Sequence, residues 1–133
     1  MKKILFVCKF NRFRSQIASG WFNKLNTNKN YFATSAGVIK GSSIGVEVKD
    51  YASKNKLKLS SPRGLERSWL NSQDMIVIVA NDVHPSIFKT LKSVGKRIVV
   101  WKINDVNESG KGEFMLTINK IKSRVQKLVQ SLK

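Results

Sequence analysis

One cysteine and one arginine near the N-terminus have a spacing that could support nucleophilic chemistry on an oxyanion. Cys8 is the only cysteine of the chain, and Arg14 follows it after five intervening residues. A loop of this length can curl so that its backbone N–H groups point inward at an anion. A thiolate is a strong nucleophile, and a planar guanidinium can bind two oxygens of one phosphoryl group. The spacing therefore predicts that Cys8 attacks an oxyanion that Arg14 holds.

The segments on either side of this loop are predicted to hold it at the end of a strand. The apolar residues 4–7 precede Cys8, as in a buried strand. A helix is expected from Ser15, because apolar residues recur there at helical spacing: Ile17, Ala18, Trp21, Phe22 and Leu25. The positive end of the helix dipole and nearby cations favour a thiolate at the mouth of the loop. We therefore expect the sulfur to be ionised.

Strand-like and helical patterns alternate along the whole chain, which predicts an α/β fold with a parallel sheet covered by helices on both faces. Strands are expected at residues 3–7, 31–35, 75–79 and 97–101. Helices are expected from residue 15, from about 43 to 55, from about 85 to 93, and from about 112 to the C-terminus. The apolar positions of the last helix are predicted to be core: Met115, Ile118, Ile121, Val125, Leu128 and Leu132.

Three residues that could do chemistry are expected to meet at one rim of this sheet. In open α/β sheets, ligands bind outside the carboxyl ends of the strands. Cys8 leaves the first predicted strand at that edge, while Asp82 and Asp105 follow the third and fourth. Asp82 could equally be the N-cap of the helix that contains Pro85. His84, the only histidine, is interpreted as a loop residue.

The chain is strongly basic, with 25 Lys and Arg against 8 Asp and Glu and a formal net charge of +17. Such a field attracts anions. Because the basic residues are mostly lysines spread along the chain, we expect it to steer an acidic phosphorylated protein toward the site. Specific binding of nucleic acid is not expected, although loose binding at low salt is.

Length and composition place further limits on the protein. The 133 residues are expected to form a single domain, 1–133, and one cysteine excludes a disulfide scaffold. No cofactor and no metal site are expected. No apolar run has the length of a membrane span or a signal peptide, so we expect a cytoplasmic protein that does not bind membranes. A monomer is expected.

Residues 4–18 read Ile-Leu-Phe-Val-Cys-x-x-Asn-x-x-Arg-Ser-x-Ile-Ala. This segment resembles the active-site loop of the low-molecular-weight protein tyrosine phosphatases and of the arsenate reductases that share their fold. With Lys9, Phe10 and Arg12 it is most similar to the archaeal branch. Segments 35–37, 74–82 and 101–105 also have counterparts, so the resemblance covers nearly the whole chain. It implies a three-layer, four-stranded parallel sheet with strand order 2-1-3-4.

The resemblance also implies a role for each matching residue. Cys8 would be the nucleophile, Arg14 the phosphate clamp and Asp105 the general acid, although Val106 stands where the family has proline. The phosphate-binding loop would comprise these residues as well: Lys9, Phe10, Asn11, Arg12, Phe13 and Ser15. The Ser15 hydroxyl would hydrogen-bond the thiolate, and Asn11 suits a position of positive φ. Ser35 and Asp82 would support the loop.

The residues around the loop bear on substrate choice. Tyrosine-specific relatives place aromatic residues after the acid, whereas this chain has Val106, Asn107 and Glu108. Apolar walls could instead come from these side chains: Phe10, Phe13, Ile39 and Phe114. The Arg12 position separates phosphotyrosine from phosphoarginine in relatives, and an arginine there disfavours the cationic substrate.

Taken with the resemblance, these features predict a cysteine-dependent phosphatase that hydrolyses phosphotyrosine or another aryl phosphate through a phosphocysteine intermediate. Two alternatives stay open. One is an arsenate reductase that uses an external thiol, because the chain has no further cysteine to relay a disulfide. The other is a non-catalytic module that binds anions or nucleic acid.

Overall fold

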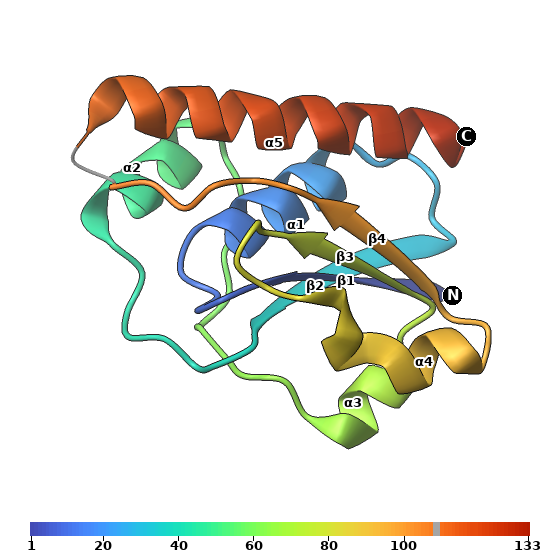
Figure 1. Ribbon diagram of the computed structural model, residues 1–133. Coiled ribbons are helices and arrows are strands. Elements are labelled where there is room, and N and C mark those ends of the chain that lie inside the picture. The colour runs from blue at the N-terminus through green and yellow to red at the C-terminus, as the bar shows by residue number, and fades with distance from the viewer. Residues whose placement is uncertain (108–109) are drawn as a thin grey trace.

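Four parallel strands form the centre of the molecule in the computed structural model, which describes residues 1–107 and 110–133 (Figure 1). The strands are β1 (Lys2–Cys8), β2 (Tyr31–Gly37), β3 (Met75–Val79) and β4 (Arg97–Trp101). Their order is β2-β1-β3-β4, which confirms the predicted parallel sheet with order 2-1-3-4. Each strand is joined to the next by a helical crossover, as parallel pairing requires.

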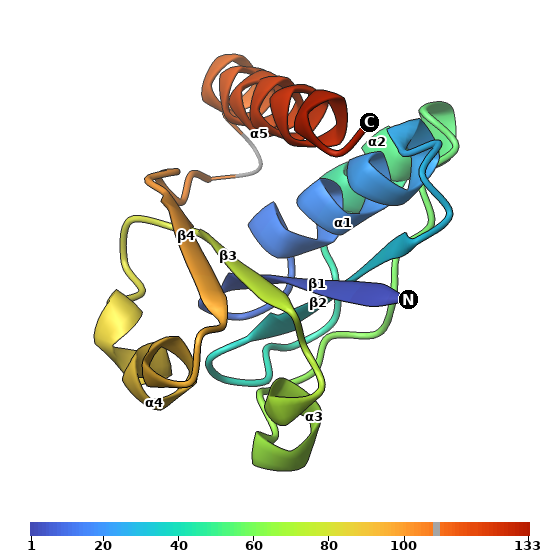
Figure 2. The same ribbon diagram turned by 90° about the vertical axis from the view of Figure 1, so that its right-hand side faces the viewer.

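Helices cover both faces of the sheet, so the molecule has three layers (Figures 1 and 2). One face carries α1 (Arg14–Leu25), α2 (Val46–Lys54) and α5 (Lys111–Ser131). The other face carries α3 (Arg67–Asn71), the 3₁₀ helix η1 (Pro85–Phe88) and α4 (Lys89–Ser93). The three-layer α/β class predicted from the sequence is therefore confirmed.

The sequence of β1 is apolar without alternation because this strand lies in the middle of the sheet. Successive side chains of a strand point to opposite faces, and both faces of this strand are covered. Ile4 and Phe6 pack into the core under α1 and α5, while Leu5 and Val7 pack into the core above α3 and α4. All four side chains are fully buried. Cys8 is the last residue of this buried strand, so it lies at the carboxyl edge of the sheet.

Helix boundaries differ from the prediction at several places. The helix expected from about residue 43 begins at Val46, because Gly45 provides its N-cap in an extended conformation. The helix expected at 85–93 is divided into η1 and α4. The short helix α3 was not predicted, because it has only five residues and none of them is buried. A helix of five residues is too short to show a helical period in the sequence.

One predicted core residue of the last helix is exposed. Met115 is 41% exposed, whereas its neighbour Phe114 is buried together with Ile118 and Ile121. Positions separated by four and three residues share one face of an α-helix, and Met115 lies about 100° around the helix from Phe114. Leu132, also predicted within this helix, follows its last residue as the C-cap.

The structure also decides what caps η1. The backbone N–H of Ser86 donates to the Nδ1 atom of His84 over 3.1 Å, so His84 is the N-cap. Asp82 does not have that role, and its carboxylate pairs with Arg14. Within the described ranges 1–107 and 110–133, no helix has the length and apolar character needed to cross a membrane.

Candidate active site

A small cavity lies where β1 and β4 end, and Cys8 is at its wall. Its volume is about 160 Å³. The residues that line it come from the loop after β1 and the segment after β4: Cys8, Phe10, Arg12, Phe13, Arg14, Asp105, Val106 and Asn107. Cys8 is only 2% exposed, and its thiol is free. The cavity therefore presents a buried sulfur to a ligand that enters between these two segments.

Asn11 holds the loop in shape from behind the cavity. It is fully buried and has a φ of 57°, a left-handed conformation that asparagine tolerates better than most residues. Its Nδ2 atom donates to the hydroxyl oxygens of Ser15 (2.8 Å) and Ser35 (3.0 Å). Its Oδ1 atom accepts from the backbone N–H of Arg63 (3.1 Å) and from Nε2 of Gln16 (3.3 Å). All the polar atoms of this buried amide are thus engaged.

The Arg63 contact also fixes which way the amide of Asn11 faces. A backbone N–H can only donate, so the atom that it meets must be the amide oxygen. The nitrogen then faces Ser15 and donates to its hydroxyl oxygen. Ser15 keeps its own hydrogen, and its oxygen lies 3.0 Å from the sulfur of Cys8. Ser15 is therefore placed to donate a hydrogen bond to a thiolate.

Arg14 is the largest fully buried side chain of the protein's described part, and three groups surround its guanidinium. Nη1 donates to the carbonyl oxygen of Ile103 over 2.9 Å. Nη2 lies 3.0 Å from Oδ1 of Asp82, and Nε lies 3.9 Å from Oδ1 of Asp105. A buried charge is tolerated when it is paired and hydrogen-bonded in this way. Segments that follow β3 and β4 thus orient the arginine in the cavity wall.

Asp105 is the carboxylate residue that lines the same cavity as Cys8, and about half of its side chain is exposed to solvent (53%). Its Oδ1 atom accepts a hydrogen bond from the backbone N–H of Val106 over 3.1 Å. A proline at that position has no N–H to donate. The N–H of Val106 therefore restrains the Asp105 carboxylate by a hydrogen bond that a proline could not form. A proline would instead restrain the backbone angle φ.

A second loop supports the Cys8–Arg14 loop along its backbone. The N–H groups of Val38, Ile39 and Gly41 donate to the carbonyl oxygens of Cys8 (3.0 Å), Lys9 (3.0 Å) and Phe10 (3.1 Å), respectively. The two loops approach so closely at Gly37 that a Cβ atom there would lie 2.6 Å from the Ile39 oxygen and 2.7 Å from the Asn11 nitrogen. Only glycine fits at this position.

A third segment, around residues 60–63, was not identified from the sequence. Gln16 donates to the carbonyl oxygen of Ser60 (2.9 Å) and accepts from its N–H (3.0 Å), and Arg63 Nε donates to the Ser35 carbonyl oxygen (3.1 Å). The Arg63 guanidinium also stacks on Trp69, with its Cζ atom 3.7 Å from the ring centre. Burial lowers the pKa of Arg63, and the Glu66 carboxylate opposes that effect. No spacing in the sequence marks these residues, because they lie far from the loop along the chain.

The structure brings the predicted site residues together in two layers. Cys8, Arg14 and Asp105 line the cavity together with Phe10, Arg12 and Phe13. The other predicted residues support that wall through hydrogen bonds or an ion pair: Asn11, Ser15, Ser35 and Asp82. Lys9 is exposed and outside the lining, and its ammonium lies 5.3 Å from the centre of the Phe10 ring.

Two of the four expected apolar walls are not part of the cavity. Phe114 is buried, and its ring stacks on that of Phe13 with 5.0 Å between the ring centres. Phe114 thus supports a lining residue and does not line the cavity itself. Ile39 is 54% exposed and is not among the described residues that line the cavity. Val106 and Asn107 do line it, which agrees with the absence of an aromatic clamp at these positions. Glu108 lies outside the described residues.

Comparison with known proteins assigns the chain to a family. Residues 3–133 match the model of the low molecular weight phosphotyrosine protein phosphatases. The chain belongs to this family. The strand order β2-β1-β3-β4 and the helices on both faces agree with the fold of this family. The membership that the resemblance in the sequence implied is thus confirmed.

Solved structures of this family and fold are similar over nearly the whole chain. An arsenate reductase from Archaeoglobus fulgidus is 30% identical, with a TM-score of 0.79 and coverage of 96% of this chain and 98% of that one. A low molecular weight protein tyrosine phosphatase from T. tengcongensis is 20% identical, with a TM-score of 0.84 and coverage of 98% and 99%. The YwlE arginine phosphatase from Geobacillus stearothermophilus is 16% identical, with a TM-score of 0.80 and coverage of 99% and 93%. No curated protein matches significantly.

Proposed function

We propose that this protein is a cysteine-dependent phosphatase that hydrolyses phosphotyrosine or other aryl phosphate monoesters through a phosphocysteine intermediate. The observation that carries the proposal is that Cys8, Arg14 and Asp105 all line one cavity of about 160 Å³. A nucleophile, an oxyanion clamp and a proton donor are the three groups that such a hydrolysis requires.

In the first half of the reaction, the thiolate of Cys8 attacks phosphorus and forms the S–P bond as the P–O bond to the leaving group breaks. Arg14 binds two of the phosphoryl oxygens, and its fixed orientation favours the transition state, in which negative charge moves onto these oxygens. Asp105, protonated at the start, gives its proton to the leaving oxygen. Phe10 and Phe13 offer apolar surface to an aryl group in the cavity wall.

In the second half, water attacks the phosphocysteine and the S–P bond breaks. The carboxylate of Asp105 takes a proton from that water, so the acid is restored for the next cycle. The sulfur leaves as a thiolate, and a hydrogen bond from the Ser15 hydroxyl, 3.0 Å away, stabilises its negative charge. Inorganic phosphate is then released and the free enzyme is regenerated.

Turnover of a chromogenic aryl phosphate at mildly acidic pH tests this proposal. Cys8→Ser is expected to abolish hydrolysis and to leave binding of phosphate or vanadate largely intact, because Arg14 and the loop remain. Arg14→Lys is expected to lose both binding and rate, since a lysine cannot bind two oxygens in one plane. Near-normal turnover by Cys8→Ser would show that another residue is the nucleophile.

Arsenate reduction is the second candidate, and it is favoured by the 30% identical relative described as an arsenate reductase. Cys8 would displace hydroxide from arsenate to form an S–As bond. An external thiol would then attack the sulfur, so that arsenic leaves as arsenite with the electron pair and a mixed disulfide remains, which a second thiol reduces. Arsenite release that depends on an added low-molecular-weight thiol, in a protein without aryl phosphate turnover, would favour this candidate.

The natural substrate that we propose is an acidic phosphoprotein, which the net charge of +17 would attract. The proposed setting is the cytoplasm, with the chain acting as a monomer of one domain. Retention of sequence-selective nucleic acid at physiological salt would instead support the binding-module alternative.

A further inference from the structure

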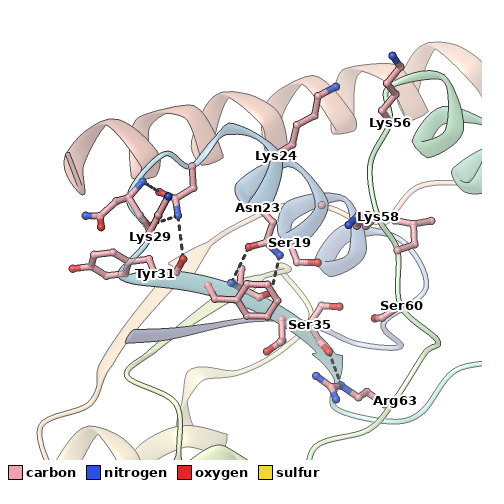
Figure 3. A pocket seen from close by; sticks show the side chains of 17 residues that line it. Ser19, Asn23, Lys24, Lys29, Tyr31, Ser35, Lys56, Lys58, Ser60 and Arg63 are labelled. Carbon is pink, nitrogen blue, oxygen red and sulfur yellow. Dashed lines mark hydrogen bonds between the residues drawn. The ribbon is translucent and has the colours of Figure 1, made fainter. Parts of the chain in front are cut away.

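A second and larger cavity lies beside the edge strand β2 (Figure 3), and Cys8 is not among the described residues that line it. Its volume is about 630 Å³, which lies within the range of about 300–1,000 Å³ that is typical of small-molecule sites. Its walls come from α1, the turn before β2, β2 itself and residues 56–63. Five cationic side chains line it: Lys24, Lys29, Lys56, Lys58 and Arg63. None of the described residues in its lining is acidic.

The sequence explains why carboxylates are absent from these walls. The first acidic residue of the chain is Glu47, and residues 51–65 contain none. The segments that form the cavity therefore contribute lysine and arginine without a compensating charge. A concave, low-dielectric wall with charges of one sign concentrates counter-ions, so this cavity attracts anions more strongly than a flat surface would.

Several of the cations are available to a ligand. Within residues 1–107 and 110–133, the ammonium groups of Lys29, Lys56 and Lys58 form no ion pair or hydrogen bond. Lys24 donates to the carbonyl oxygen of Asn55. In Figure 3, Lys29 and Arg63 lie toward opposite ends of the cavity, so positive charge is distributed along its length. One phosphate group could not meet all of these cations.

Lys56 stands where a smaller residue would be favoured. Its φ is 57°, and the N–H of Leu57 donates to the carbonyl oxygen of Ala52 over 2.8 Å, so Lys56 occupies the left-handed position that ends α2. Glycine is the usual residue there, because a side chain makes this conformation unfavourable. A lysine thus occupies a position at which the backbone favours glycine, and it is one of the residues that line the cavity.

The edge of β2 is closed to an extended peptide. The N–H and carbonyl of Ala33 are both paired with the side-chain amide of Asn23 (3.0 and 2.8 Å), and the carbonyl of Tyr31 accepts from Asn26 Nδ2 (3.1 Å). These bonds, drawn as dashed lines in Figure 3, occupy the groups that an added strand would need. A ligand of this cavity must therefore be recognised by its charge.

We propose that this cavity binds a small anion that carries two or more phosphate groups. The concave shape and volume fit a small molecule, the separated cations fit several phosphates, and the occupied strand edge disfavours a polypeptide. The proposal does not depend on the hydrolytic activity, because the cavity does not include Cys8, Arg14 or Asp105.

Calorimetric titration with inorganic tripolyphosphate at physiological salt tests the proposal. Cys8 is the only cysteine, so alkylating it blocks the smaller cavity and leaves the larger one intact. The alkylated protein is expected to bind one equivalent. The double variant Lys56→Gly/Lys58→Ala is expected to bind it at least about tenfold more weakly, as expected for lost charge-assisted contacts. Arg63 is left unchanged, because it also braces Asn11 and Ser35.

A matched control distinguishes binding in the cavity from general attraction by the positive surface. Lys120→Ala/Lys127→Ala removes the same charge from exposed positions of α5 outside the cavity and is expected to leave binding unchanged. Equal weakening by both double variants, or no binding by the alkylated protein, would overturn the proposal. So would orthophosphate, or an Asp/Glu-rich peptide of equal charge, binding as tightly as tripolyphosphate. Melting temperatures confirm that each variant is folded, and aryl phosphate turnover is measured separately.

Discussion

The side-chain amide nitrogen of Asn11 lies 2.8 Å from the hydroxyl oxygen of Ser15, and this contact decides what Ser15 offers to Cys8. Because the Ser15 oxygen accepts from Asn11, its one hydrogen is free to point at the sulfur 3.0 Å away. The backbone of Arg63 keeps the amide in that orientation. A side chain outside the cavity lining thus sets the donor for the proposed leaving thiolate.

Ser15→Ala is expected to lower kcat by about 10- to 100-fold, the equivalent of about 1.5–3 kcal/mol for a lost hydrogen bond to a charged group. The loss is expected in breakdown of the phosphocysteine, so rapid-mixing kinetics should show a burst of the aryl product. Ser53→Ala, on the exposed side of α2, makes the same change elsewhere and should leave kcat unaltered. An unaltered kcat in Ser15→Ala would contradict the assigned role.

Asp105→Asn is expected to lower kcat by about 10²–10⁴ for substrates with poor leaving groups, the usual range for a lost general acid. For p-nitrophenyl phosphate a much smaller loss is expected, because that leaving group needs little protonation. Asp82→Asn should affect both substrates alike, since Asp82 Oδ1 lies 3.0 Å from Nη2 of Arg14 and Asp82 is not among the described residues that line the cavity. A dependence on leaving group in Asp82→Asn, and none in Asp105→Asn, would reverse the two roles.

Gly37→Ala is expected to destabilise the protein by about 1–3 kcal/mol, the usual range for overpacking, and to distort the Cys8–Arg14 loop. Its Cβ would lie 2.6 Å from the oxygen of Ile39 and 2.7 Å from the nitrogen of Asn11, and neither backbone atom can move independently. Gly112→Ala in α5 is the control, because its Cβ meets nothing within 4 Å. Urea unfolding of the two variants measures the difference, and equal stability would contradict the close approach of the two loops.

Arg12→Ala is expected to raise kcat/KM for phosphoarginine relative to phosphotyrosine by about tenfold, because a cation that repels the substrate guanidinium is removed. Arg12 lines the cavity, and its Nε donates to the Ser43 carbonyl oxygen over 2.9 Å, so the charge is held in place. Competition between the two phosphorylated peptides gives the ratio directly. Lys40→Ala, an exposed cation outside the cavity lining, should leave the ratio unchanged.

Salt is expected to lower kcat/KM for an acidic phosphopeptide steeply and to change kcat little. Screening shortens the Debye length from about 10 Å at 0.1 M to about 3 Å at 1 M, which weakens the attraction by the net charge of +17. Chemistry at the buried sulfur is screened much less. A neutral phosphopeptide serves as the comparison, and an equal salt dependence for both peptides would rule out steering.

The segment from β1 to α1 could be predicted from the sequence because its structure depends on neighbours along the chain. An unbroken apolar run gave the buried strand, helical spacing gave α1, and the tolerance of asparagine for positive φ suited Asn11 to the loop. The meeting of Cys8 and Asp105 followed from a general rule for parallel sheets. Each of these inferences needs only the order and type of nearby residues.

Only the tertiary structure decided which distant groups complete the site. Asp82 pairs with Arg14, and His84 takes the capping position that Asp82 could have filled. The backbone N–H of Arg63, 52 residues from Asn11 in the sequence, orients the amide of Asn11. Such pairs form because the crossovers stack layers on the sheet at particular distances, and a pattern that describes one segment contains no information on what another segment brings against it.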